Sequence, residues 1–304
     1  MKVDILLPIY NSVSEVRNCI ESILNNTSAT HYDLYLLDDC STDPEVMEIS
    51  EYYTNEYKNI FSYRHKVNLG FPGNVNFGLN LTQNDVVILN SDTIVTKNWL
   101  TKLIDASNLN EKIAAVNPLT NYGVISSIPT IYEKVNNEFT IDEITNAIDS
   151  LQETNYPEVP MLVGFCMYMK RKAINEVGIF DAKTFNRGYG EETDWCLRAK
   201  NLGYKLIICD DCYVKHIGAS SFGDEKTKLI ERSTKIINKK YPYYHTEIMQ
   251  FQYNHPLKYM RINLSRKLRV PIKDRLRYEL RLKKMRIRHI LKPLHHMSRE
   301  TRNE

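Results

Sequence analysis

The chain has 304 residues and a formal net charge of +3, which allows one large domain or a core domain with an appendage. It contains no apolar run of about 18 residues, so we expect no transmembrane span. The strand-like run 3–7 follows the N-terminus directly, includes Asp4 and lacks a small-residue cleavage site, so we expect no signal peptide. The Cys209–Cys212 spacing has no second pair to complete a zinc site, and we interpret all six cysteines as reduced thiols of a cytoplasmic protein.

The charge is unevenly distributed along the chain. From His255 onward there are 16 Lys or Arg against 4 Asp or Glu, a net charge of +12. The first 254 residues hold 24 against 33, a net charge of −9. An acidic body with a basic tail is the main compositional indication of a partner.

Strands and helices are predicted to alternate over the first 120 residues. Ser14 is placed to cap a helix whose apolar residues recur at helical spacing, and Pro44 opens another helix at its first position. Alternation at this spacing is typical of a parallel, doubly wound sheet. The predicted strands are 3–7, 33–37, 60–64, 86–89 and 113–117, and a helix is expected around 97–108.

The second half of the chain is less regular at first. We interpret 121–160 as a lid or insertion with one helix near 141–151. The later pattern predicts a strand at 162–169, a short helix that ends at Val177, and a loop that passes into a helix between 188 and 198. The last predicted elements are strands 205–209 and 213–216 and a helix at 224–240.

Polar groups follow the ends of several predicted strands. The apolar run from Val86 stops at Asp92, which delivers a carboxylate to the carboxyl edge of a parallel sheet, where open α/β folds bind ligands. The alternative is that Asp92 only caps the next helix. A late strand ends on His216, and an imidazole with a carboxylate is a reasonable ligand pair for a divalent metal whose shell a diphosphate would complete. The alternatives are a partly buried histidine with protein partners only and, for Glu191 and Glu192, a solvated helix start.

Five motifs occur together in one order over roughly residues 3–220. They are Pro8-Ile-Tyr-Asn11, Asp38-Asp39-Cys-Ser41-Thr-Asp43, Asn68-Leu-Gly70 with Asn74, Asn76 and Gly78, Asn90-Ser91-Asp92, and Gly190-Glu191-Glu192-Thr-Asp194-Trp195. In that order they resemble the motifs of family-2 glycosyltransferases with the GT-A fold.

The resemblance implies the fold and its division. We expect an α/β fold of GT-A type, with a mostly parallel sheet flanked by helices, over residues 1–241. Its donor-binding half is expected at about 1–120 and its acceptor half at about 121–241. A basic helical extension, 242–304, would follow.

The resemblance also implies a nucleotide-sugar pocket. Asp39 takes the place of the acid that pairs with the base, uracil or thymine, and Asp38 is a lesser candidate beside it. The other residues implied at this pocket are Pro8, Tyr10, Asn11, Asn68, Gly70, Asn76, Asn90, Ser91 and Asp92.

The metal site implied by the resemblance departs from the family pattern. Asn90-Ser91-Asp92 replaces the Asp-x-Asp motif, and because its first acid is Asn here, Asp92 is left as the main carboxylate for Mn²⁺ or Mg²⁺. His216 matches a histidine that some members add to the metal shell.

The catalytic assignments come from the last motif. Glu192 takes the position of the general base, with Glu191 as the fallback, and the pair replaces the more usual Glu-Asp. Asp194 and Trp195 are interpreted as acceptor-side or pocket-supporting residues, and core packing is the alternative for Trp195.

The function implied is an inverting, metal-dependent transfer of a sugar from a UDP- or dTDP-sugar to a hydroxyl of a glycan. We expect it to act in the synthesis of surface polysaccharide, such as capsule or cell wall, or of lipid-linked oligosaccharide, with rhamnose as one plausible donor sugar. The alternatives are a glycosylated protein, such as an adhesin, as acceptor, and a catalytically silent nucleotide-sugar-binding partner subunit.

The basic tail indicates a location. Residues 258–302 interleave Lys and Arg with apolar residues, and Leu276–Leu280 and Ile287–Leu291–Leu294 have helical spacing. A basic amphipathic helix is typical of a membrane-surface element, so we expect a cytoplasmic protein that is peripheral at the inner face of the cell membrane. No nucleic-acid module is present, and we expect no nucleic-acid partner; a solvated tail or a homo-oligomer contact is the alternative.

Overall fold

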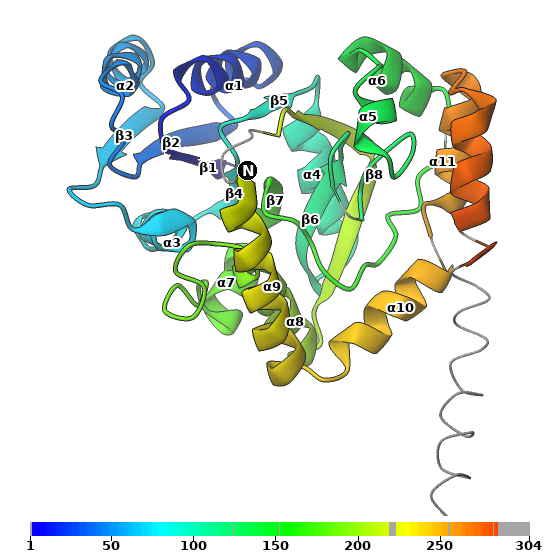
Figure 1. Ribbon diagram of the computed structural model, residues 1–304. Coiled ribbons are helices and arrows are strands. Elements are labelled where there is room, and N and C mark those ends of the chain that lie inside the picture. Colours follow the sequence, from blue (N-terminus) through cyan, green and yellow to red (C-terminus); the bar gives the residue numbers. More distant parts are fainter. Residues whose placement is uncertain are drawn as a thin grey trace, which may run out of the picture.

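The computed structural model describes residues 2–123, 125–151, 153–218, 223–254, 256–281 and 283–284. Within them an eight-stranded sheet, in the order β3-β2-β1-β4-β7-β6-β8-β5, is flanked by helices (Figure 1). Its strands are β1 (Val3–Ile9), β2 (Tyr32–Asp38), β3 (Ile60–Arg64), β4 (Asp85–Leu89), β5 (Thr93–Val95), β6 (Ile113–Leu119), β7 (Cys166–Met169) and β8 (Lys205–His216).

The sheet is mostly parallel, as expected. β1 is parallel to β2 and β4, β2 to β3, and β6 to β8. β7 runs antiparallel to both β4 and β6, and β5 runs antiparallel to β8. The long strands on either side of β7 therefore point the same way, and β1, β2, β4, β6 and β8 all end at one edge of the sheet.

The two faces of the sheet are covered by different helices because successive side chains of a strand point to opposite faces. In β1, Ile5 packs with α1, α2 and α4, whereas Leu6 packs with α3 and the helices of the second half. The helices of the first half are α1 (Val13–Asn26), α2 (Glu45–Glu56), α3 (Gly70–Leu81) and α4 (Trp99–Asn108). Figure 1 shows α1 and α2 on the side of the sheet opposite to α3.

α3 forms although its residues have low intrinsic helix propensity. Its twelve residues include Gly70, Gly73 and Gly78 and one proline, all poor helix formers. A Cβ at Gly78 would come within 2.7 Å of Leu37 and 2.9 Å of Leu6. Close packing of the helix on the sheet, rather than local propensity, therefore stabilises α3.

The second half contains α5 (Glu133–Asn136), α6 (Ile141–Asp149), α7 (Arg171–Val177), α8 (Glu191–Asn201) and α9 (Gly223–Lys240). The two strands predicted at 205–209 and 213–216 are one strand, β8, so that prediction is wrong. Its pairing with β6 passes from Cys209 to Tyr213, which leaves Asp210 out of the ladder. The Asp210 carboxylate instead accepts the amides of Asn155 and Tyr156 at 3.0 and 3.2 Å, and the backbone stays extended.

The first part of the basic extension is packed into the body. It forms α10 (Tyr244–Asn254), α11 (Lys258–Lys267) and a further helix at 272–281. Leu257 and Leu264 belong to the same core cluster as Leu6, and α11 lies beside α6 (Figure 1). The core therefore continues past the boundary expected at 241. The predicted apolar positions Ile287, Leu291 and Leu294 lie outside the described residues. In the part of the chain that the structure describes, no helix is both long enough and apolar enough to cross a membrane.

Candidate active site

Asp92 and His216 meet because β5 pairs with the end of β8. The register places Thr93 opposite His216, and the Ile217 amide donates to the Asp92 carbonyl at 2.8 Å. His216 Nε2 then lies 3.2 Å from Asp92 Oδ1, and both side chains remain partly exposed, at 12% and 15%. Two residues 124 positions apart thus form one polar pair at the carboxyl edge of the sheet.

His216 is held in place by residues that sequence analysis did not identify. Asn121 accepts the His216 amide at 2.8 Å and donates to the His216 carbonyl at 2.9 Å. The imidazole stacks on Phe165, with ring centroids 5.4 Å apart, and lies 5.5 Å from the Tyr122 ring. No local motif marks these residues, since Asn121 stands in the irregular region and Phe165 inside an apolar run.

Two buried polar atoms at this place lack partners. His216 Nδ1 and Asn90 Oδ1 have no hydrogen-bond partner among the described residues, although buried polar atoms are normally satisfied. Asn90 otherwise uses its backbone: its amide donates to the Phe165 carbonyl and its carbonyl accepts from Thr93. Ser91 lies half-buried between Asn90 and Asp92. An imidazole nitrogen and an amide oxygen beside a carboxylate are donors that suit a divalent cation.

The described residues form no cluster of three or more His, Cys, Asp or Glu that could hold a metal ion. The protein would therefore contribute Asp92 and His216, and further oxygens would have to come from a ligand.

Asp39 lies at the end of β2 against the start of α3. Its Oδ1 accepts the Leu69 amide at 2.7 Å, and its carbonyl accepts from Asn68 Nδ2 at 3.1 Å. Burial raises the pKa of Asp39, and the Leu69 amide opposes that shift. The fold therefore brings together Asp39, Asn68 and Gly70, which the sequence placed in one pocket.

Asp38 has a different role from its neighbour. Its two carboxylate oxygens bind the Ser41 amide at 2.8 Å and the Arg64 guanidinium at 2.7 Å, and its side chain is only 3% exposed. Both oxygens are thus engaged by the protein, which favours a structural role over ligand contact.

The end of β1 carries an exposed aromatic ring, Tyr10, and a residue that joins two loops, Asn11. Pro8 is half-buried inside β1, while Tyr10 at the edge is 49% exposed. Asn11 accepts the amides of Thr42 and Asp43 at 2.8 and 3.1 Å. Asn11 therefore joins the loops after β1 and β2. Of Pro8, Tyr10 and Asn11, Tyr10 has the side chain that a nucleotide base could reach.

Asn76 is engaged within the fold. Its amide nitrogen donates to the Phe180 carbonyl and its oxygen accepts the Phe180 amide, both at 2.9 Å. With both polar atoms used, Asn76 ties α3 to the turn before α8 and is not available to a nucleotide sugar.

Glu191 and Glu192 open α8 beside α3. Glu191 is 3% exposed, and its Oε2 has no hydrogen-bond partner among the described residues. Burial, followed by the charge of Glu192, raises the pKa of Glu191 well above its usual value. Burial also raises the pKa of Glu192, but hydrogen bonds, including one from the Gly190 amide, oppose that shift. Burial thus raises the pKa of both acids, and the charge of Glu192 adds to the shift of Glu191.

Phe71, near the start of α3, lies close to the loop before α8 and to the segment before β7. A Cβ at Gly188 would lie 3.9 Å from both Phe71 and Glu191, and one at Gly164 would lie 3.7 Å from Phe71. Gly164 adjoins Phe165, the ring that stacks on His216. Phe71 therefore packs near both the loop before α8 and the segment before β7.

Asp194 and Trp195 cannot contact an acceptor directly, because neither side chain reaches the surface. The carboxylate of Asp194 binds Arg198 at 2.9 Å, Lys240 at 2.5 Å and the Tyr241 hydroxyl at 2.8 Å. The acceptor-side interpretation is thus wrong for direct contact. Asp194 instead anchors α9 to α8, and Trp195 packs in the core, with its indole N–H donating to the Gly178 carbonyl at 2.8 Å.

Curated relatives match part of the chain. An uncharacterised protein of Mycobacterium tuberculosis is 30% identical over 156 residues, which is 50% of this chain and 55% of that protein. Poly(ribitol-phosphate) beta-glucosyltransferase of Bacillus spizizenii is 35% identical over 74 residues, 24% of this chain and 12% of that enzyme. The chain thus spans about half of the length of the first of these relatives and much less of the second.

Solved structures share the fold. GalNAc-T7 in complex with UDP, GalNAc and Mn²⁺ superposes with a TM-score of 0.62 at 13% identity, over 89% of this chain and 55% of that one. TarS residues 1–349 of S. aureus in complex with UDP-GlcNAc superpose with a TM-score of 0.51 at 18% identity, over 78% and 67%. The architecture is that of GT-A glycosyltransferases.

The sequence pattern of the family described as Glycosyl transferase family 2 matches residues 4–178, more than half of the chain. That range contains four of the five ordered motifs and ends before the fifth. The chain therefore belongs to glycosyl transferase family 2.

Proposed function

We propose that this glycosyltransferase is metal-dependent and inverting, and that it moves a hexose from a UDP- or dTDP-sugar to a hydroxyl of a glycan. The observation that carries the proposal is the Asp92–His216 pair at the carboxyl edge of the sheet, where His216 Nδ1 has no hydrogen-bond partner among the described residues. The acid pair at the start of α8 supports it. One pair is suited to the diphosphate end of a donor and the other to the acceptor hydroxyl.

Asp92 and His216 would hold Mn²⁺ or Mg²⁺. Such an ion, when bound, neutralises the charge that develops on a diphosphate leaving group. Asn121 fixes the His216 backbone and Phe165 fixes the plane of the ring, so the two side chains are positioned before a ligand arrives. Asn90, which replaces the usual first acid, leaves the protein with one carboxylate at this position.

Glu192 would accept the proton of the acceptor hydroxyl. A hydroxyl is a poor nucleophile until a base takes its proton, and a well-placed base contributes typically about 10²–10⁴-fold to the rate. Burial raises the pKa of Glu192, which is the direction that suits a general base, and it also raises the pKa of the neighbouring Glu191. Direct displacement by the activated hydroxyl inverts the anomeric centre.

The donor and acceptor classes rest on similarity and on Asp39. GalNAc-T7 and TarS were solved with UDP or UDP-GlcNAc, and an acidic side chain such as Asp39 can accept the ring N–H of uracil or thymine. The relative that acts in poly(ribitol-phosphate) glucosylation supports a surface-polymer acceptor. Work on such an acceptor, or on a lipid-linked precursor, would place the protein at the cytoplasmic face of the membrane.

The test is nucleotide release from a panel of UDP-, dTDP- and GDP-sugars, with and without Mn²⁺. We expect slow, metal-dependent hydrolysis of one donor, which Asp92→Ala abolishes and the exposed control Asp105→Ala leaves unchanged. Glu192→Gln should lower transfer by about 10²–10⁴-fold while sparing donor binding.

Two outcomes would contradict the proposal. Unchanged turnover in Glu192→Gln would remove Glu192 from the base role, and a large loss in Glu191→Gln would then transfer that role to its neighbour. Donor binding without release, even with glycan acceptors added, would favour the silent nucleotide-sugar-binding subunit.

A further inference from the structure

The helix at 272–281 carries a row of exposed apolar side chains. Ile272, Leu276 and Leu280 are spaced four residues apart, so they lie along one side of the helix. They are 66%, 51% and 56% exposed. Adjacent large apolar side chains at this exposure are typical of an interaction site rather than of ordinary surface.

A row of cations runs beside the apolar row. Lys273, Arg277, Arg281 and Lys284 follow the same helical spacing. Together with the two leucines and Tyr132 they line a hollow of about 460 Å³, and the residues that line it include no Asp or Glu. Arg277 also lies over the Tyr132 ring, 4.6 Å from its centroid. The hollow thus combines four cations with apolar walls, which suits an anionic group attached to a hydrocarbon chain.

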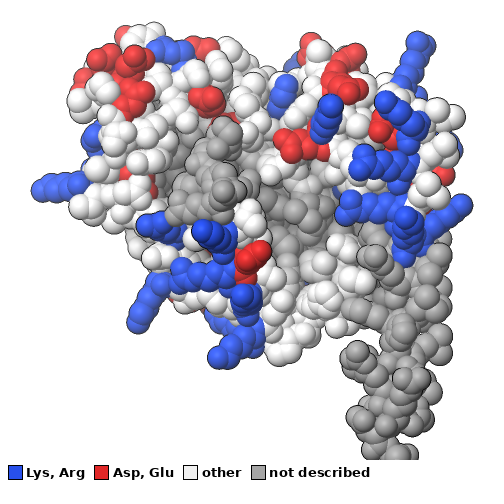
Figure 2. Space-filling view, in the orientation of Figure 1, with Lys and Arg blue, Asp and Glu red and all other residues white. Residues whose placement is uncertain are grey.

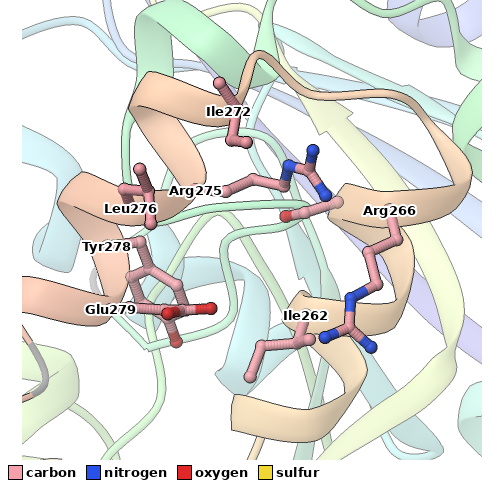
Figure 3. A pocket seen from close by; sticks show the side chains of 8 residues that line it. Ile262, Arg266, Ile272, Arg275, Leu276, Tyr278 and Glu279 are labelled. Carbon is pink, nitrogen blue, oxygen red and sulfur yellow. The ribbon is translucent and has the colours of Figure 1, made fainter.

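A smaller hollow of about 190 Å³ lies on the other side of the apolar row. Figure 3 shows Ile272 and Leu276 facing Ile262 and Arg266 of α11 across it. The apolar row is therefore a ridge between two hollows, and each of them has arginine at its margin.

The body of the protein determines which side of the helix faces outward. Tyr278, on the side of the helix opposite to the apolar row, is 3% exposed and interacts with the buried Arg261 of α11. Figure 2 shows Lys and Arg side chains gathered over the end of the molecule that α11 occupies in Figure 1. The apolar and cationic rows are thus presented together to the surroundings.

We infer that this face, formed by Ile272, Leu276 and Leu280 with Lys273, Arg277, Arg281 and Lys284, docks on a membrane surface that contains anionic phospholipid. A soluble polyanion would satisfy only the cations, whereas the interfacial region of a bilayer supplies both phosphate and hydrocarbon. Each cation near an anionic surface adds about fivefold to binding. The inference does not depend on sugar transfer, because docking requires no donor.

The test is cosedimentation of the full chain, without nucleotide, with vesicles of phosphatidylcholine alone or mixed with phosphatidylglycerol. Binding is expected only to the anionic vesicles and should weaken as salt is added. Leu276→Asp with Leu280→Asp should reduce it by on the order of tenfold per leucine. Arg281→Gln with Lys284→Gln should reduce it by about 25-fold.

Matched controls carry the same changes elsewhere on the surface. Leu109 and Leu202 are both 59% exposed, and Lys58 is exposed at the end of α2. Leu109→Asp, Leu202→Asp and Lys58→Gln should change binding by less than about twofold, because these side chains lie outside the docking face. All variants have exposed side chains, and unchanged thermal unfolding verifies that the fold is retained.

Three results would overturn the inference. In the first, the native chain stays in the supernatant when anionic vesicles sediment. In the second, it binds vesicles of pure phosphatidylcholine equally well. In the third case the leucine variants would bind as tightly as the native chain while a soluble anionic polymer competes, and the face would then be a polyanion site.

Discussion

Arg261 offers the sharpest test of how the extension supports the body. It is 2% exposed, and its Nε and Nη2 donate to the carbonyls of Ser127 and Ile125 at 2.8 and 2.7 Å. Burial lowers the pKa of the Arg261 guanidinium, and the interaction with Tyr278 opposes that shift. Arg261→Met keeps a side chain of similar length but removes the two hydrogen bonds to the carbonyls and the interaction with Tyr278.

The expected cost follows from the two carbonyls. Leaving a buried acceptor without a donor costs about 1–3 kcal/mol, so two cost about 2–6 kcal/mol. Removing a buried guanidinium returns part of its desolvation penalty. We therefore expect the free energy of unfolding to fall by about 3 kcal/mol. Arg261→Lys should rescue little of this, because a single ammonium cannot reproduce the two-pronged contact of the guanidinium.

The same substitution should also affect the proposed metal site at Asp92 and His216. The segment 125–128, whose carbonyls Arg261 binds, is hydrogen-bonded to Thr120. The Thr120 amide donates to the Ser126 carbonyl at 3.1 Å, and the Thr120 carbonyl accepts the Ile128 amide at 2.9 Å. The next residue, Asn121, holds the His216 backbone. Arg261→Met should thus weaken Mn²⁺ binding in the presence of UDP, in addition to lowering stability.

Denaturant unfolding and Mn²⁺ titration at a temperature where the variant is folded measure the two effects. The exposed Arg266 on the same helix provides the matched control, and Arg266→Met should change the free energy of unfolding by no more than about 0.5 kcal/mol. If Arg261→Met behaved like this control, the two carbonyls would have other partners, and the argument that α11 supports the site would fail.

Two further predictions concern the proposed donor pocket at Asp39 and the contact between Gly70 and the loop before α8. Burial raises the pKa of Asp39, so UDP affinity should be highest with the ionised carboxylate and should fall by up to about tenfold per pH unit as pH drops through that raised pKa. Calorimetric titration with UDP from neutral to acidic pH measures this dependence. If the native chain and Asp39→Asn showed the same pH profile, Asp39 would not be the group that binds the base. Gly70 has φ +72°, and a Cβ there would overlap the Asn186 carbonyl, so Gly70→Ala should displace the loop before α8 and lower both thermal stability and transfer. Gly203, at φ +82° with nothing within 4 Å of its Cβ position, isolates backbone strain, and equal losses in Gly203→Ala would show that the Asn186 contact does not matter.

Local pattern alone predicted much of the first half of the chain. Strand 60–64 was placed with the bounds of β3, and Asp92 was placed at the end of a buried strand, since alternating apolar runs and turn residues act over a few positions. The ordered motifs then identified the family. Motifs whose residues lie within a few positions of one another can therefore be recognised without a structure.

Some assignments depended on partners that no local pattern announces. Asp194 and Asp38 are both acids in family motifs, yet each forms an ion pair with a cation of another element. Asp194 binds Lys240, and Asp38 binds Arg64. Asn76 is satisfied by Phe180, 104 residues away. An acidic or amide side chain is free for a ligand only if the fold leaves it so, and long-range hydrogen bonding decides that.

The sequence by itself determined the family, the α/β alternation and the carboxylate at the end of β4. Only the tertiary structure decided that Asp92 meets His216, because the contact requires the short antiparallel β5, a three-residue strand too brief to carry a sequence signal. It also decided that the basic extension begins as part of the core, through Leu264 and Arg261. A buried arginine and an exposed one have the same letter in a sequence, and only packing distinguishes them.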